Sequence, residues 1–191
     1  GFEGQLAAGK LRALGAFGAQ RSPLLPNVPT ATEQGFPMAT RFLHGLGTTQ
    51  GTPRDVINPA DHNDRVGTVV EATPEACELA FAFAATAAAA WQATSPADRA
   101  ATLCRAADLL QAGMPTLLGL IVREAGKTFP AAIAEIREAV DFLRYYAAEI
   151  RNHFDNATHR PLGPVVAISP WNFPLSIFTG QIAGALAAGN V

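Results

Sequence analysis

Residues 165–174 read VVAISPWNFP, and this stretch decides the fold that the sequence predicts. Val165–Ile168 has no charge and is rich in β-branched side chains, which is typical of a strand buried on both faces of a parallel sheet. Ser169–Pro174 follows as a turn, and residues 175–188 then predict a helix rich in small side chains. Val191 would begin the next strand. Strand, turn, helix and strand form the repeating unit of a doubly wound α/β sheet, so we expect the start of such a sheet, cut off at its second strand.

The residues before this stretch predict helices with clear boundaries. Thr73-Pro74-Glu75 and Ser95-Pro96-Ala97-Asp98 each place a hydroxyl cap before a proline and an acid, the signature of a helix start. These two helices would end near Trp91 and Gly113, and a third would span 115–125. A fourth helix has one apolar stripe, and its length favours a packed core helix over a coiled coil. The stripe consists of Ile133, Ile136, Val140, Leu143, Ala147 and Ile150.

A β-hairpin is predicted upstream of these helices. Asn58-Pro59-Ala60 would end its first strand, Asp61–Asp64 would form a polar turn, and Val66–Val70 would be the second strand. From Asn58 onward the chain therefore predicts regular secondary structure that leads into an α/β sheet.

Composition excludes several classes of function. The chain has 191 residues and a formal net charge of −2, which does not fit a non-specific nucleic-acid binder. Its two cysteines, Cys77 and Cys104, are too few for a disulfide framework or a cysteine metal cluster, so no metal site is expected. The charge-free run 161–191 is long enough for a membrane span, but prolines interrupt it and we expect none. No signal-peptide pattern is visible, and we expect a cytoplasmic protein.

The turn Ser169–Pro174 is the candidate site. Ligands of open α/β sheets bind beyond the carboxyl ends of the strands, which is where this turn would lie. Asn172 is a side-chain amide between two prolines, suited to donate a hydrogen bond to developing negative charge. The alternative is a turn-forming residue bonded to its own backbone. Trp171 and Phe173 would form walls of the pocket.

Several motifs carry a family resemblance. Residues 163–175, with the following 177–181, resemble the signature turn of the aldehyde dehydrogenase superfamily. Residues 123–128, 138–146 and 154–163 narrow the resemblance to the L-glutamate γ-semialdehyde dehydrogenase module of bifunctional proline utilisation A proteins. The resemblance covers about 58–191. It implies an N-terminal part of an aldehyde dehydrogenase fold, with hairpin, helices and the start of a doubly wound parallel sheet.

This resemblance also implies a reaction and a set of residues. The reaction is the NAD-dependent oxidation of L-glutamate γ-semialdehyde, formed from pyrroline-5-carboxylate, to glutamate. Asn172 would be the oxyanion-hole amide, and the backbone of residues 168–171 would line the nicotinamide side of the cofactor cleft. Glu138 and Phe173 would contact the aldehyde, although Glu138 suits a solvated helix position equally well. The cofactor-lining residues are Ile168, Ser169, Pro170 and Trp171.

The resemblance also implies what this sequence lacks. The family's catalytic Cys and Glu have no counterpart here, and Cys77 and Cys104 cannot be the nucleophile by position. Without the nucleophile of a covalent mechanism we expect the chain by itself to be inactive. The family is homo-oligomeric, but the sequence does not indicate whether this chain associates.

Residues 1–57 follow a different pattern. The segments 9–14, 21–30, 33–37 and 51–57 resemble the periplasmic substrate receptors of tripartite tricarboxylate transporters. The sequence therefore predicts two parts, a receptor-like fragment at 1–57 and an aldehyde dehydrogenase fragment at 58–191. Alternative functions are a carboxylate-binding receptor fragment or an inactive chimeric product.

Overall fold

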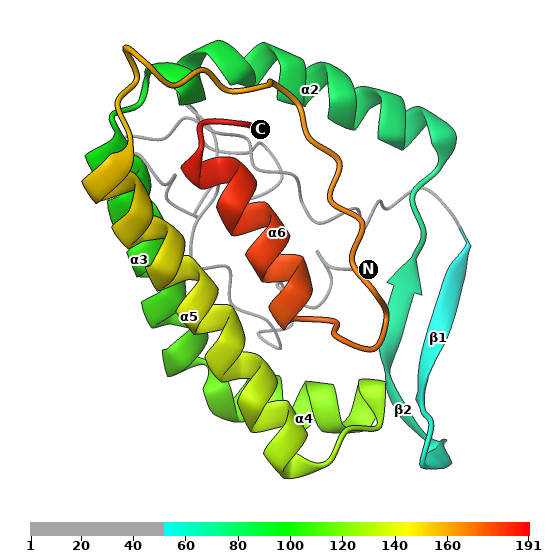
Figure 1. Ribbon diagram of the computed structural model, residues 1–191. Helices are drawn as coiled ribbons and strands as arrows, with labels where there is room; N and C mark the ends of the chain where they lie inside the picture. Colours follow the sequence, from blue (N-terminus) through cyan, green and yellow to red (C-terminus); the bar gives the residue numbers. More distant parts are fainter. Residues whose placement is uncertain (1–51) are drawn as a thin grey trace, which may run out of the picture. The chain divides into compact units, whose positions relative to one another are not determined.

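The computed structural model describes residues 52–191 (Figure 1). Residues 70–83 belong to one compact unit, and residues 53–69 and 84–191 belong to a second. Each unit is considered by itself, and the candidate site lies entirely in the second. In chain order the elements are β1 Pro53–Asn58, β2 Asp61–Val70, α2 Pro74–Ala93, α3 Pro96–Ala112, α4 Met114–Ala125, α5 Phe129–His153 and α6 Ser176–Ala187.

The predicted hairpin is present, but its turn lies earlier than expected. β1 and β2 form a two-stranded sheet joined at Pro59 and Ala60, whereas the predicted turn Asp61–Asp64 is the start of β2. The Asn58 side chain explains the position of the turn, because its Oδ1 accepts the Ala60 N–H at 2.9 Å. An asparagine that bonds the backbone two residues on stabilises a tight turn by itself.

The predicted helices are confirmed, and their caps show why they begin where they do. The Thr73 hydroxyl accepts the Ala76 N–H at 3.2 Å before α2. The Ser95 hydroxyl accepts the Asp98 N–H at 3.1 Å before α3, with Pro96 in the first turn. α4 ends at Gly126, which has a φ of 63° in the left-handed region that favours glycine. Among residues 52–191, no helix is long and apolar enough to cross a membrane.

The core of the second unit lies between α3, α5 and α6. The apolar stripe of α5 is buried as predicted, except that Ile133 is exposed. α3 lies along one side of this helix and α6 along another (Figure 1). The contributing core residues are Ala100, Leu103, Ala107, Val140, Leu143, Ala147, Ile150, Ala183 and Ala187.

Small residues let α6 approach α5 closely. A Cβ atom at Gly180 would lie 2.8 Å from the nearest ring carbon of Phe142, and one at Gly184 would lie 3.2 Å from the Tyr146 ring. A side chain at either position would meet an aromatic ring of α5, so these glycines permit the close packing of α6 on α5.

Gly180→Ala is expected to destabilise the chain by about 1–3 kcal/mol, because the Phe142 ring must move to admit the methyl group. Gly119→Ala is the matched control in α4, since a Cβ there meets nothing within 4 Å. The control is expected to stabilise by roughly 0.5–1 kcal/mol through helix propensity alone. Chemical denaturation measures both values, and equal effects at the two glycines would contradict close packing at Gly180.

Acid is expected to weaken the attachment of the hairpin to α4. The Asp64 carboxylate accepts hydrogen bonds from Arg123 and Asn58, and the bond from Arg123 is the main cause that lowers its pKa from 3.8 to about 2. A folded-state pKa below the unfolded value stabilises the fold above the unfolded pKa, and this stabilisation is lost as pH falls towards the folded pKa.

The check is the free energy of unfolding measured between about pH 5 and pH 2, where this carboxylate takes up its proton. We expect the native chain to lose stability more steeply over this range than Asp64→Asn. If the free energies of unfolding of the two proteins fall in parallel with pH, the contact between Asp64 and Arg123 does not contribute to stability.

The strand predicted at Val165–Ile168 is not formed in this structure. Val166 is 62% exposed and Ile168 is 82% exposed, so the segment is not buried on both faces. The Val165 N–H donates to the Val191 oxygen at 2.7 Å, and the Val191 N–H donates to the Gly163 oxygen at 3.3 Å. These two bonds make one step of a parallel pair, but neither Val191 nor the segment forms a strand. The described part contains one sheet, made of β1 and β2, and neither of these strands pairs with the rest of the segment.

Candidate active-site turn

The turn Ser169–Pro174 lies between this extended segment and the first residue of α6. The Phe173 N–H donates to the Pro170 oxygen at 3.3 Å, which closes the turn around Trp171 and Asn172. Both of these side chains are exposed, and Trp171 is 86% exposed. In the described part of the chain, the Asn172 amide has no hydrogen-bond partner. The alternative in which Asn172 bonds its own backbone is therefore not the arrangement of this structure.

The beginning of the turn is held by Gln181 of α6. The Gln181 side-chain amide donates to the Ile168 oxygen at 3.0 Å. Ile168 is the first of the four residues expected to line the nicotinamide. The resemblance motifs include Gln181 but give it no role, and this contact makes it an anchor of the candidate cofactor segment.

The end of the turn is held by Glu135 of α5. Its Oε1 accepts the N–H groups of Leu175 at 2.8 Å and of Ser176 at 3.4 Å. These N–H groups are at the start of α6, where the first turn of a helix has no backbone acceptors of its own. Sequence reasoning did not find Glu135, although its place beside Ile136 on the buried face of α5 is a signal, because acids are rarely buried there.

Lys127 completes this group of contacts. Its ammonium forms an ion pair with Glu135, and it lies 4.3 Å from the centre of the Phe173 ring. The side chain of Lys127 is 15% exposed and that of Glu135 is 1% exposed. We call Glu135 and Lys127 the α6 anchor. It joins α5, the residue before α6 and the aromatic side chain that follows Asn172.

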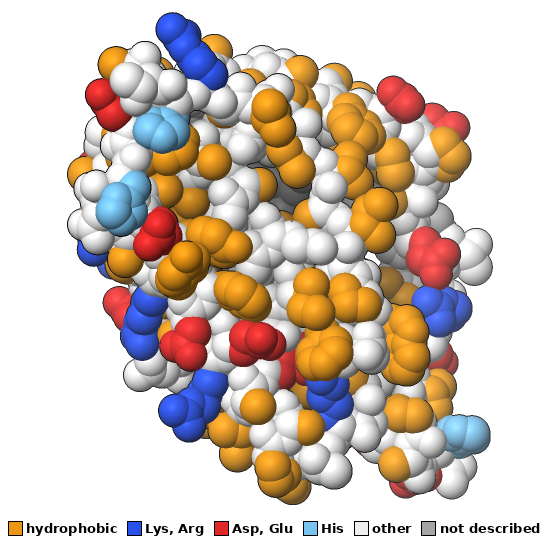
Figure 2. Space-filling model, in the orientation of Figure 1, with side chains coloured by type: hydrophobic (Ala, Val, Ile, Leu, Met, Phe, Trp, Pro, Cys, Tyr) orange, Lys and Arg blue, Asp and Glu red, His pale blue; other side chains and the backbone are white. Residues whose placement is uncertain are grey.

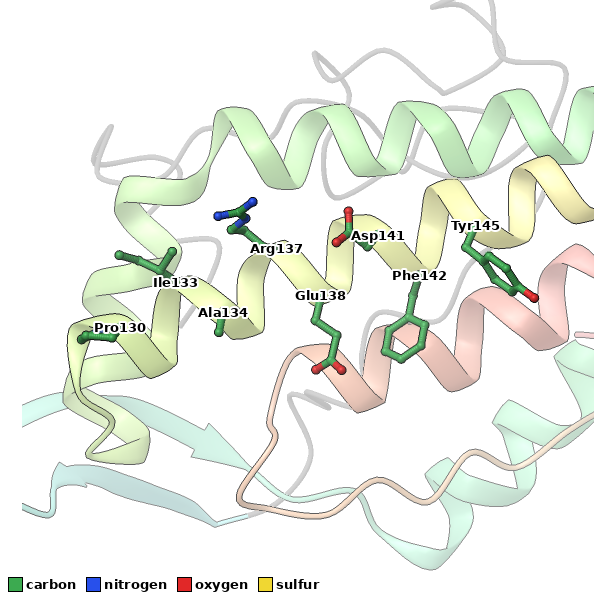
Figure 3. Close-up of a pocket in the computed structure, with 8 residues that line it drawn as sticks. All are labelled: Pro130, Ile133, Ala134, Arg137, Glu138, Asp141, Phe142 and Tyr145. Atoms are coloured by element: carbon green, nitrogen blue, oxygen red, sulfur yellow. The ribbon is translucent and has the colours of Figure 1, made fainter.

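The two residues expected to touch the aldehyde lie in different surroundings. Glu138 is exposed and lines an open groove on α5 together with Arg137, Asp141 and Phe142 (Figure 3). Phe173 lies over Lys127 instead. Figure 3 shows Glu138 and Phe142 pointing to the same side of α5, and Phe142 packs on Gly180 of α6. The arrangement suits Glu138 both as a solvated residue and as a contact at the edge of a site.

The segment expected to line the cofactor is apolar and accessible. Ile168, Pro170 and Trp171 are exposed and Ser169 is half-buried. Apolar side chains gather along this part of the surface (Figure 2). A flat nicotinamide ring fits such a segment, because exposed backbone and apolar side chains offer it a stacking surface. Residues 161–191 contain no charged side chain that could pair with phosphate, so the fit extends only to the nicotinamide end of NAD.

The cysteines and the possible metal ligands of the described residues do not form a second site. Cys77 in α2 and Cys104 in α3 are half-buried free thiols. The described residues contain no group of three or more His, Cys, Asp or Glu side chains suited to a metal ion.

The comparison with protein families shows to which family the chain belongs. Residues 47–191 match the aldehyde dehydrogenase family, and the chain belongs to this family. The match includes residues 47–57, which the sequence motifs assigned to a separate fragment, so the boundary at residue 58 stays a prediction. The resemblance of the first part to tricarboxylate receptors has no support among the relatives found, and residues 1–51 lie outside the described part of the chain.

The relatives narrow the class further. The chain is 64% identical over 140 residues to the bifunctional protein PutA of Escherichia coli, covering 73% of this chain and 11% of that protein. It is 38% identical over 146 residues to the 1-pyrroline-5-carboxylate dehydrogenase of Anoxybacillus flavithermus, covering 70% of this chain and 28% of that enzyme. The chain thus spans about a tenth of the PutA relatives' length.

Solved structures agree with the sequence relatives. A 1-pyrroline-5-carboxylate dehydrogenase from Thermus with bound NAD superposes with a TM-score of 0.70 at 33% identity, covering 76% of this chain and 31% of that one. Proline utilization A from Bdellovibrio bacteriovorus superposes with a TM-score of 0.69 at 32% identity, covering 75% and 16%. The fold is therefore the N-terminal part of an aldehyde dehydrogenase fold, as the sequence predicted.

Proposed function

We propose that this chain contributes the oxyanion-binding turn of an NAD-dependent L-glutamate γ-semialdehyde dehydrogenase in proline catabolism. The observation that carries the proposal is the exposed Asn172 amide, unpartnered among the described residues, on a turn held at both ends by Gln181 and Glu135. The contacts of Gln181 and Glu135 hold the backbone that carries this donor, and a donor held in place lowers the cost of reorganisation when negative charge develops. The PutA and pyrroline-5-carboxylate dehydrogenase relatives support the choice of substrate.

Each site residue has a distinct part in this proposal. Asn172 donates a hydrogen bond to the aldehyde oxygen as that oxygen becomes negative. The backbone of residues 168–171 would hold the nicotinamide end of NAD, which would serve as the hydride acceptor when bound. Phe173 and Glu138 contact the substrate, with Phe173 as an apolar wall and Glu138 at the rim near α6. We propose that the protein acts in the cytoplasm on a small-molecule aldehyde.

The 191-residue chain by itself is expected to form no NADH from L-glutamate γ-semialdehyde. Covalent aldehyde oxidation requires a thiolate nucleophile beside the oxyanion donor. Cys104 in α3 contacts Arg151 at the end of α5, with 3.6 Å between Sγ and the guanidinium. Cys77 is in the first turn of α2. The measurement is NADH absorbance with purified chain, and NADH formation above the level without protein would contradict the prediction.

An exchange enzyme tests the proposed activity. The exchange enzyme is Escherichia coli PutA in which the chain's own residues replace the 140-residue segment that matches them. We expect it to oxidise L-glutamate γ-semialdehyde in preference to α-ketoglutaric semialdehyde. The second aldehyde is the comparison because an α-ketoglutaric semialdehyde dehydrogenase of Bacillus subtilis is 39% identical to this chain over 163 residues. A reversed preference would overturn the choice of substrate.

A further inference from the structure

We infer that Glu135 and Lys127, the α6 anchor, are positioning residues that hold the Asn172 turn in place for oxyanion binding. This inference rests on the proposed function of Asn172. Neither side chain touches the candidate substrate groove on α5. Both act on the polypeptide just after Asn172, Lys127 at the Phe173 ring and Glu135 at the N–H groups of Leu175 and Ser176.

The burial of the anchor points to a role in placing the start of α6. Moving a carboxylate and an ammonium out of water costs several kcal/mol per ion, and replacing a buried pair with apolar residues is often neutral or stabilising. Glu135 stands on the face of α5 that otherwise buries Ala132, Ile136 and Ala139. An apolar residue would suit that face as well. What an apolar residue cannot do is accept the N–H groups at the start of α6.

The contacts make one continuous path from α5 to Asn172. Oε1 of Glu135 accepts the Leu175 N–H at 2.8 Å, and a carboxylate at a helix N-terminus is also favoured by the helix dipole. Oε2 is paired with Lys127, which leaves Oε1 directed at α6. The Lys127 ammonium then lies over Phe173, the residue next to Asn172. Gln181 holds Ile168 at the other end, so side-chain contacts attach the turn on both sides.

Loss of the anchor therefore frees one end of the turn while the core remains. The Val140, Leu143 and Ala183 contacts between α5 and α6 do not involve either residue of the anchor. We expect α6 to stay packed and its first turn to fray. A displacement of about 1 Å at a catalytic group can reduce turnover by roughly 100-fold. The effect should fall on kcat and leave the KM for NAD unchanged, because Gln181 still holds Ile168.

The test uses the double variant Glu135→Leu/Lys127→Met, which removes both charges and leaves neither one unpaired. Glu135→Ala, which also removes the acceptor of the Leu175 and Ser176 N–H groups, is the second variant, should the double variant fail to fold. Glu149→Gln in α5 is the control for loss of a glutamate from the same helix. In the 191-residue chain, amide hydrogen exchange at Leu175 and Ser176 is expected to become at least about tenfold faster in the variants, as local opening costs less free energy. The control should match the native chain.

The exchange enzyme gives the functional readout. The variants are expected to lower kcat by about 10–100-fold at unchanged KM for NAD, while Glu149→Gln keeps the native kcat. Unchanged amide exchange at Leu175 and Ser176, or unchanged kcat in an active enzyme, would overturn the inference. If the unmutated exchange enzyme forms no NADH, the proposed function fails, and amide exchange in the 191-residue chain still decides whether the anchor holds the turn.

Discussion

Asn172→Ala in the exchange enzyme is expected to lower kcat by about 100–1,000-fold, the usual loss when one oxyanion donor is removed. The change removes the exposed amide and leaves the backbone of residues 168–171 intact. The turn should keep its shape, because its anchors are Gln181 and Glu135 and not Asn172 itself. The KM for NAD is therefore expected to stay close to the native value. Steady-state kinetics with L-glutamate γ-semialdehyde and NAD measure both constants.

Asn152→Ala is the matched control for this prediction. Asn152 is exposed in the last turn of α5, and the same truncation there should leave kcat unchanged. A native kcat for Asn172→Ala would remove Asn172 from the chemistry. A fall in kcat together with a large rise in the KM for NAD would assign it to cofactor binding instead.

Arg99→Met is expected to reduce the free energy of unfolding by about 3 kcal/mol, since buried acceptors lose a charged donor that no water replaces. Arg99 is 1% exposed. Its guanidinium donates to the backbone oxygens of Ala187 at 3.0 Å and Thr94 at 2.6 Å, and to the Asn156 side chain at 3.0 Å. Burial lowers the pKa of Arg99. The buried charge of Arg99 needs no carboxylate partner, because the carbonyls at helix ends carry partial negative charge.

The bonds of Arg99 explain the size of this effect. They join the residues after α2, the end of α6 and the loop after α5, so one side chain holds three segments of the chain together. Arg99→Lys should recover only part of the stability, as an ammonium has fewer donors and no planar fork. Arg160→Met, at an exposed position, is the control and should change stability little. Urea denaturation measures all three variants, and equal stabilities for Arg99→Met and Arg160→Met would contradict the role of Arg99.

Local signals in the sequence were sufficient for the helices. The Ser95 cap, the left-handed Gly126 and the stripe that includes Val140 and Leu143 each depend on residues within one or two turns. Such features form wherever the chain can bury the apolar face, and the structure has them where the sequence predicts. The sequence also indicated that α6 could pack closely on a neighbour at Gly180, because small residues in a helix permit a close approach.

Features that depend on distant partners were not predictable in the same way. Val165–Ile168 has the composition of a buried strand, but a strand also needs neighbours, and Val191 provides only one step of pairing. Buried Glu135 breaks the apolar pattern of α5, yet its partner Leu175 is 40 residues away. The sequence placed Asn172 on a turn after the segment, and the contacts that hold this turn appeared only with the structure.

NADH formation by the unmutated exchange enzyme tests the central claim most directly, because the Asn172 turn of that enzyme comes from this chain alone. The reference is the Escherichia coli relative assayed with the same aldehyde and NAD. We predict that the exchange enzyme oxidises L-glutamate γ-semialdehyde at a rate comparable to that of its parent. An exchange enzyme that folds and binds NAD but forms no NADH would contradict the claim that this chain contributes a working oxyanion site.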